Sequence, residues 1–123
     1  MSEIRATTIS DLAGTGPATL TGQYAAKAWV SAGADASLLD SQNISSGTDN
    51  GTGNYTYAFS NAMSNANFAV IAACDHGGVP VFSANVGSKA TSSYVVEHGY
   101  TSTAPAYVDA DLANYSAIHG DLA

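Results

Sequence analysis

The sequence predicts an all-β fold: a single β-sandwich domain, jelly-roll-like, with an extended N-terminal arm. Apolar and polar residues alternate over residues 54–59, which is the period of two of a half-buried strand. Short apolar stretches recur along the chain between breaks rich in glycine and asparagine, at the spacing of a sandwich. Apolar residues do not recur at the three- and four-residue spacing of a helix. The length of 123 residues fits one domain.

The first 22 residues differ from the rest of the chain. Glycine and proline interrupt them, and their large aliphatic side chains are Ile4, Ile9, Leu12 and Leu20. These side chains are too few to bury against one another, because fixing a segment in place costs conformational entropy that a core must offset. We therefore predict that residues 1–22 form an arm that anchors the protein to another chain, and that residues 23–123 form the sandwich.

Seven short strands are predicted within residues 23–123. In chain order they are residues 26–30, 37–44, 54–59, 68–74, 79–84, 92–98 and 115–120. Tyr55, Tyr57 and Phe59 share one side of the third strand, and the preceding Asp-Asn-Gly-Thr-Gly run suits a tight reversal. Residues 68–74 are apolar at every position, which predicts a central strand buried on both faces. Residues 75–78 then predict a hairpin into residues 79–84.

Charge argues against nucleic acid as a partner. Ten acidic residues stand against Arg5, Lys27 and Lys89, giving a formal net charge of -7, which a phosphate backbone would repel. No stretch approaches the roughly 20 apolar residues that span a bilayer, so we expect no membrane insertion. The opening residues lack the basic and apolar regions of a secretory signal, which predicts synthesis in a cytoplasm.

Residues of catalytic type are present without a catalytic pattern. Cys74, Asp75 and His76 include a thiol and a base, but neighbours in a strand point to opposite faces, and the apolar flank predicts a buried, unreactive cysteine. No phosphate-binding loop, dinucleotide fingerprint or nucleophile elbow is present. The sequence therefore predicts a protein that is not an enzyme and that needs no cofactor.

Metal binding is not predicted from the remaining polar residues. Asp109 and Asp111 resemble half of a calcium loop whose other ligands are absent, and the pair Asp35 and Asp40 has no spacing that points to glycoside hydrolysis. One alternative stays open: in a trimer, a single histidine facing the axis would be presented three times. The candidates for that position are His98 and His119.

Four tyrosines in the C-terminal third are the candidate ligand-binding residues. They are Tyr94, Tyr100, Tyr107 and Tyr115. They stand among Ser, Thr, Asn and Asp, a mixture that suits recognition of sugars or protein surfaces, and residues 99–114 are the loop most suited to it. The alternative is that these rings pack on the core with their hydroxyls in water.

Two sequence blocks resemble a known group of proteins. Ala26-Lys27-Ala28-Trp29-Val30 and the run from Thr48 to Thr56, TDNGTGNYT, are similar to a small β-rich domain of tail fibres and other virion proteins of bacteriophages, especially marine ones. The ends of the chain are similar to that group too, whereas residues 31–41 depart from its usual Asn-Phe-Asn-Gly run.

The resemblance implies a place in a virus particle, with synthesis in the host cytoplasm. It implies a homotrimeric tail-fibre or receptor-binding component that is joined to other virion proteins by its arm and meets a host glycan or protein. Alanine-rich strand faces bury little area, so assembly of identical copies would add stability. The alternative is a protein that decorates or cements a capsid or tail without a host ligand; an enzyme that degrades polysaccharide comes third.

Overall fold

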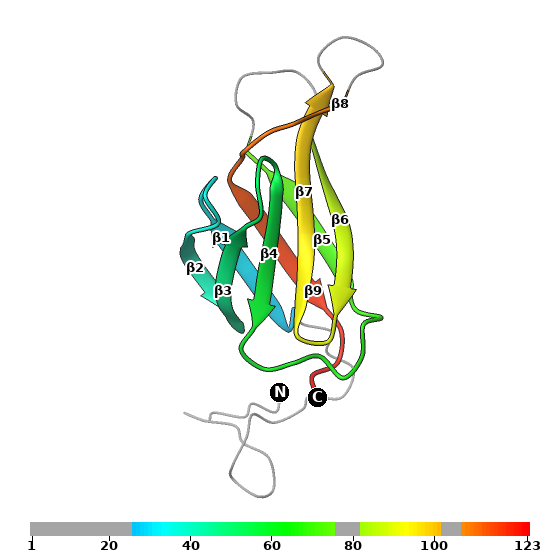
Figure 1. Ribbon diagram of the computed structural model, residues 1–123. Coiled ribbons are helices and arrows are strands. Elements are labelled where there is room, and N and C mark those ends of the chain that lie inside the picture. The colour runs from blue at the N-terminus through cyan, green and yellow to red at the C-terminus, as the bar shows by residue number, and fades with distance from the viewer. Residues whose placement is uncertain (1–25, 76–81, 102–106) are drawn as a thin grey trace, which may run out of the picture.

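The computed structural model describes residues 26–75, 82–101 and 107–123, and within these ranges nine strands form two antiparallel sheets packed as a sandwich (Figure 1). The strands are β1 (Ala28–Ala32), β2 (Leu38–Gln42), β3 (Ile44–Asp49), β4 (Asn54–Phe59), β5 (Ala69–Cys74), β6 (Phe82–Ala90), β7 (Ser93–Thr101), β8 (Tyr107–Asp109) and β9 (Asn114–His119). The predicted all-β sandwich is confirmed. The predicted arm, residues 1–22, lies outside the described residues.

Each sheet combines neighbours in sequence with strands from farther along the chain. The first sheet has the order β2-β1-β9-β5, so the last strand of the chain lies between β1 and β5. The second sheet has the order β3-β4-β7-β6, and the short β8 pairs with the end of β7. In Figure 1 the second sheet lies in front of the first.

The chain passes from the first sheet to the second at Asn43. This residue has a φ of 57°, in the left-handed region that asparagine tolerates better than most residues. Its Oδ1 accepts a hydrogen bond from the backbone N–H of Asn61 at 2.7 Å, and its Nδ2 donates to the Asn61 carbonyl at 3.1 Å. The single strand predicted over residues 37–44 was therefore wrong: the corner divides it between β2 and β3.

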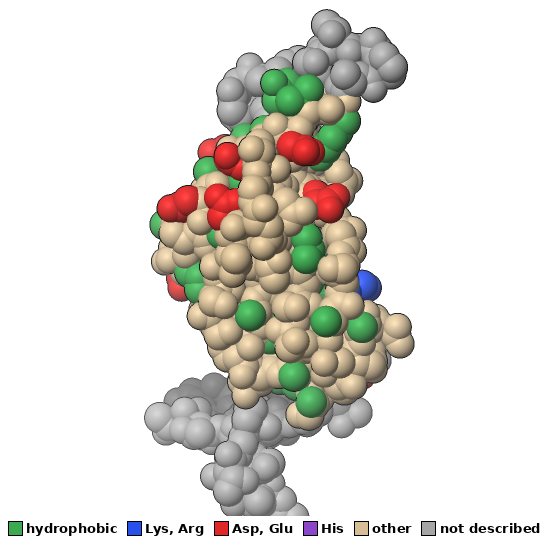
Figure 2. Space-filling model, viewed as in Figure 1, with side chains coloured by type: hydrophobic (Ala, Val, Ile, Leu, Met, Phe, Trp, Pro, Cys, Tyr) green, Lys and Arg blue, Asp and Glu red, His purple; other side chains and the backbone are tan. Residues whose placement is uncertain are grey.

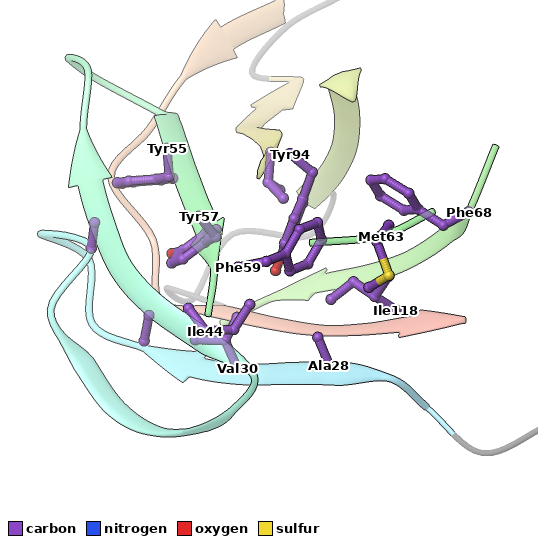
Figure 3. Close-up of a cluster of buried hydrophobic side chains, with 13 residues drawn as sticks. Ala28, Val30, Ile44, Tyr55, Tyr57, Phe59, Met63, Phe68, Tyr94 and Ile118 are labelled. Atoms are coloured by element: carbon purple, nitrogen blue, oxygen red, sulfur yellow. The ribbon is translucent and has the colours of Figure 1, made fainter. Parts of the chain in front are cut away.

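The core has large side chains from one sheet and small side chains from the other. Tyr55, Tyr57 and Phe59 project from β4 into the sandwich, as the alternation predicts, and are 0%, 0% and 8% exposed. The facing sheet contributes mainly small or aliphatic side chains from β1 and β9, namely Ala28, Val30, Ala32, Ser116 and Ile118 (Figure 3). This complementarity lets two sheets about 10 Å apart fill the space between them.

Aromatic contacts continue from β4 to β7 and to the segment before β5. Tyr57 lies opposite Tyr94 in the β4–β7 register, with 5.6 Å between ring centroids. Phe59 stacks on Tyr94 at 5.6 Å and meets Phe68 edge-on at 5.5 Å. Aromatic pairs at these separations add about 0.5–1.5 kcal/mol beyond the area that they bury.

The prediction that residues 68–74 form a central strand buried on both faces was wrong. β5 pairs with β9 and stands at the end of its sheet's order, and its residues alternate between exposed and half-buried. A stretch that is apolar throughout hides this alternation, because Ala69 and Ala73 tolerate water. β5 and β6 belong to different sheets, so the predicted hairpin between them was wrong as well.

Several polar side chains are buried between the sheets in a connected chain of hydrogen bonds. Tyr94 shares a 2.6 Å hydrogen bond with Oγ of Ser116, which accepts from Nδ2 of Asn114 at 3.2 Å. Nε2 of His98 lies 3.2 Å from Oδ1 of Asn114, and Nδ1 of His98 lies 3.2 Å from the Leu112 carbonyl. These bonds tie β7 to β9, and hence one sheet to the other.

Tyr57 differs from Tyr94 in this respect. Its hydroxyl oxygen is buried with no hydrogen bond of good geometry among the described residues. Burial raises the pKa of Tyr57 to about 12, and the nearby Asn114 side chain has a smaller, opposite effect. A buried polar atom without a partner costs about 1–3 kcal/mol of desolvation that nothing offsets.

This contrast predicts opposite effects for the same substitution at two facing rings. Tyr57→Phe removes an unpaired hydroxyl, so we expect the free energy of unfolding to stay the same or to rise by up to about 1 kcal/mol. Tyr94→Phe removes the bond to Ser116 and should lower it by about 1–2 kcal/mol. Urea denaturation of both variants measures the difference. Equal destabilisation by the two substitutions would contradict the assignment.

The stability of the domain should also fall in mild acid because of His98. Burial lowers the pKa of His98 below its usual 6.5, against the smaller effect of hydrogen bonds to Leu112 and Asn114. The Tyr55 ring faces the imidazole at 5.2 Å, and the Tyr55 hydroxyl contacts Asp111. As the pH falls below about 6.5, His98 is protonated in the unfolded chain but stays neutral in the folded chain. Its contribution to the free energy of unfolding is therefore fully present above this pH and is lost as the pH falls below it.

We expect the unfolding free energy of the wild type to decrease between pH 7.5 and pH 5.5, by at most about 1.4 kcal/mol per pH unit for this one group. The decrease should be smaller in His98→Gln, which keeps a polar side chain and loses the titration. Urea denaturation at several pH values measures both slopes. Parallel slopes would show that His98 does not carry the effect.

Candidate functional site

The outer face of the first sheet carries an apolar patch over β1, β9 and β5, and the neighbouring β2 adds polar side chains to the same face. The strand registers place Trp29, Ala117 and Ile71 side by side across β1, β9 and β5. The next row contains Ser31, Tyr115 and Ala73. On the β2 side, Gln42 continues the first row and Asp40 continues the second. We call the set Trp29, Ala69, Ile71, Ala73, Tyr115 and Ala117 the apolar face. Ile71 is 65% exposed and Tyr115 is 44% exposed, so this face carries large apolar side chains in contact with water.

The local sequence explains why these side chains point outward. In β1, Ala28, Val30 and Ala32 are buried and the two residues between them alternate to the other side. Trp29 therefore belongs to the outer face. In β9 the same rule buries Ile118 and leaves Tyr115 outside. Neither Trp29 nor Ile71 was predicted from the sequence to be a site residue, and the alternation in β1 was the signal that could have identified Trp29.

The apolar face ends at the edge of β5 that faces away from β9. The N–H of Asp75 donates to the Ala113 carbonyl at 3.1 Å, which continues the β5–β9 register. Hydrogen-bonded and non-hydrogen-bonded pairs alternate along an antiparallel ladder. Residues 69, 71 and 73 therefore bond to β9, and the backbone groups of residues 70, 72 and 74 point away from it. Among the described strands none bonds to this outer edge of β5, and β6 of the other sheet lies beside it.

A lysine covers one end of this edge. Nζ of Lys89 donates to the carbonyl of Phe68 at 2.7 Å and lies 5.3 Å from the centre of the Phe68 ring. Lysine at a strand edge hinders pairing with a further strand, because the charge resists burial. The six residues of β5 are uncharged, so the hindrance applies at Phe68 and not along the strand.

The outer face of the β3-β4-β7-β6 sheet is polar. Thr48 and Thr56 lie opposite each other, and Glu97 lies between Asn54 and Asn85 in the registers of its two neighbours. Figure 2 views this sheet from outside and shows acidic side chains gathered over the part nearest β8. We call this surface the polar face. The two outer faces of the sandwich therefore differ sharply in chemistry.

The structure separates the four predicted tyrosines. The prediction for Tyr94 was wrong: it is 0% exposed, because it lies on the same side of β7 as the buried Val96. Tyr115 belongs to the apolar face. Tyr100 is half-buried near the end of β7, and Tyr107 in β8 is 46% exposed. Tyr100 and Tyr107 thus lie in the paired strands β7 and β8, and Tyr115 lies in the other sheet.

Tyr107 lies against Gly99 in a defined position. A Cβ atom placed on Gly99 would be 2.7 Å from Cε1 of Tyr107, closer than two carbon atoms approach, so glycine is needed there for the ring to pack. The Tyr107 hydroxyl accepts a hydrogen bond from Nδ2 of Asn85 at 3.3 Å. Burial and, to a smaller extent, the charges of Asp109 and Glu97 raise the pKa of Tyr107, whereas the bond from Asn85 lowers it by less than burial raises it.

The structure places His98, His119 and Cys74 in different environments. His98 is fully buried, which contradicts the alternative that it faces a threefold axis. His119 is half-buried next to Ala69, and its place in an assembly stays a prediction. Cys74 is half-buried, and burial raises the pKa of its thiol, which disfavours the reactive thiolate. His76 and the arm residues Ile4, Ile9, Leu12 and Leu20 lie outside the described residues.

The acidic pairs have local structural contacts. Asp111 accepts hydrogen bonds from the N–H of Gly53 at 2.8 Å and from the Tyr55 hydroxyl at 3.1 Å, so it joins two loops. Asp35 accepts from the N–H of Ser37 at 3.1 Å within a turn. In the part of the chain that the structure describes, no three His, Cys, Asp or Glu side chains are placed to hold a metal ion. No helix long and apolar enough to cross a membrane occurs there either.

Comparison of the chain with protein families, curated proteins and solved structures finds no family model, no curated protein and no solved structure that matches it significantly.

Proposed function

We propose that the chain is a structural subunit of a bacteriophage particle, a homotrimeric tail-fibre component that assembles through its apolar face. The assignment to a phage particle is supported by the resemblance of the two sequence blocks, which fall on β1 and on the β3–β4 hairpin. The observation that carries the assembly role is the apolar face, where Ile71 and Tyr115 are 65% and 44% exposed.

An apolar surface of this kind is stabilised by burial. Removing apolar area from water contributes about 25 cal/mol per Å², and contiguous exposed apolar patches are typical of surfaces that contact other proteins. The outer edge of β5, to which no described strand bonds, adjoins the patch. A closed ring of three copies buries the surface of every copy, which an isolated chain cannot do.

The remaining surfaces have separate roles in this proposal. Residues 1–22 attach the subunit to other virion proteins, with Ile4, Ile9, Leu12 and Leu20 as the anchoring side chains. The polar face points away from the contact between copies. It is therefore available to the host surface, whose glycans or proteins the subunit meets.

The substitution Ile71→Lys should disrupt the assembly. It places a charge at the centre of the proposed contact and on an edge strand, whereas Ile71 is exposed enough for the domain to fold without it. We expect a trimer for the wild type and a monomer for the variant in sedimentation equilibrium. The matched control is Thr48→Lys, which adds the same charge on the polar face and should remain trimeric. A monomeric wild type, or a trimeric Ile71→Lys, would contradict the proposed contact.

The location of the protein in the particle tests the tail-fibre assignment. We expect a gold-tagged antibody against the chain to label the tail or its fibres in electron micrographs of intact particles. Label spread over the head would instead favour the alternative, a protein that decorates the capsid. Particles without label would overturn the virion assignment.

A further inference from the structure

We propose that the polar face carries a binding site for a neutral or amino sugar, formed by Tyr107, Glu97, Asn85 and Asn54. The proposal rests on the proposed function, since it identifies the class of host ligand that such a subunit would contact. The sequence predicted a ligand site made of four tyrosines. The site proposed here contains one of them, Tyr107, together with three polar residues from neighbouring strands.

The aromatic part of the site is the Tyr107 ring. Its contact with Gly99 and the hydrogen bond from Asn85 hold the ring in one position, although it is 46% exposed. A ring that is already fixed loses little conformational freedom when a ligand packs against it. The apolar C–H surface of a sugar is a suitable partner for such a ring, because both surfaces are then removed from water.

The polar part of the site is a row across three strands. Glu97 on β7 is directly opposite Asn54 on β4 and Asn85 on β6, and all three lie outside the core. Directly opposed side chains on one face have Cβ atoms about 5 Å apart. Gly99, which lies under the Tyr107 ring, is two residues from Glu97, or about 7 Å along β7. Sugar hydroxyl groups adjacent to the ring therefore come within reach of the row.

The hydrogen-bonding groups of the row are suited to hydroxyl ligands. Oδ1 of Asn54 and Oδ1 of Asn85 already accept bonds from Asn50 and Ser83, which orients both amides. The Asn54 amide N–H groups, the second N–H of Asn85 and the proton of the Tyr107 hydroxyl point to no partner among the described residues. Together with the acceptor Glu97 they form a mixed set of donors and acceptors, as hydroxyl groups require.

Charge selects among sugars. The negative charges of Glu97 and Asp109 are close enough to Tyr107 to raise the pKa of its hydroxyl. Acidic side chains also gather on this face in Figure 2. The chain as a whole carries a formal net charge of -7. An acidic polysaccharide or a phosphate group would be repelled, whereas a neutral sugar would not be, and an amino sugar with a free ammonium group would be attracted.

The first experiment uses the full chain on an array of bacterial polysaccharides and defined neutral, amino and acidic oligosaccharides. We expect binding to neutral or amino sugars, and titration calorimetry with the best of them then gives the affinity of each variant. Tyr107→Ala should weaken binding by about tenfold or more, and Glu97→Gln by a few-fold, because the first loses the ring surface and the second a charged acceptor.

Two controls separate the site from general effects. Tyr107→Phe keeps the ring and loses the hydroxyl with its bond from Asn85, so it should weaken binding by less than Tyr107→Ala does. Thr48→Ala, on the far strand of the same face, should bind as the wild type does. Chemical shifts of the wild type on addition of the sugar should change at residues 97–99 and 107. This measurement does not depend on the folding of a variant.

The outcomes are distinguishable from those that test the proposed function. No binding on the array, binding to acidic sugars alone, or full affinity in Tyr107→Ala and Glu97→Gln would each overturn the sugar site. In each of these three cases, a trimer found at the tail would still support the proposed function. Binding of a purified host surface protein, with no sugar bound, would likewise overturn the sugar site.

Discussion

The sandwich depends on the packing of a row of large aromatic rings in one sheet against small side chains in the other. Tyr55, Tyr57 and Phe59 fill the space between the sheets from β4, and Tyr94 extends the row to β7. At a separation of about 10 Å, the facing strands contribute mainly alanine, valine and serine, with Ile118 as the largest apolar side chain. The alanine content of β1 is thus a consequence of the tyrosines, and a larger residue at Ala28 would force the sheets apart.

The alternation of the strands determines what lies on the outside of the first sheet. The inward positions of β1 and β9 are held by Ala28, Val30, Ser116 and Ile118, so the residues between them, Trp29 and Tyr115, lie outside. In the second sheet the aromatic side chains of β4 point inward, and the outer positions are mainly polar. One packing solution therefore produces two different faces, and the proposed assembly and sugar contacts use one each.

The sequence predicted those features of the fold that depend on strict alternation, and missed those that depend on distant contacts. The pattern of β4 gave its bounds and its buried side correctly, because three rings alternate with small or polar residues. The corner at Asn43 could not be predicted, since its positive φ is stabilised by Asn61, 18 positions away. The prediction that β5 is buried on both faces was wrong because every residue in the strand is apolar, so the pattern does not show which side faces water.

For the candidate site, residue type was a weaker guide than strand register. Tyr94 stands among polar residues in the sequence, yet its side of β7 faces the core, and only the pairing with Tyr57 reveals this. Tyr107 was predicted, but its partners were not. Glu97 and the two asparagines beside it come from segments more than 10 positions apart, and they meet only because β7 lies between β4 and β6.

Charge and shape act in the same direction in the proposed assembly. The chain carries a formal net charge of -7, so copies repel one another wherever their acidic surfaces meet. The strand β5 is uncharged, whereas Asp40 of β2 lies in the same outer row as Tyr115, so the repulsion is smallest when the copies meet through the β5 side of the apolar face. Beside the outer edge of β5, Lys89 bonds to Phe68 and limits how far a further strand could extend along it. Electrostatic repulsion thus orients the copies, and burial of Ile71 and Tyr115 stabilises the contact once they are oriented.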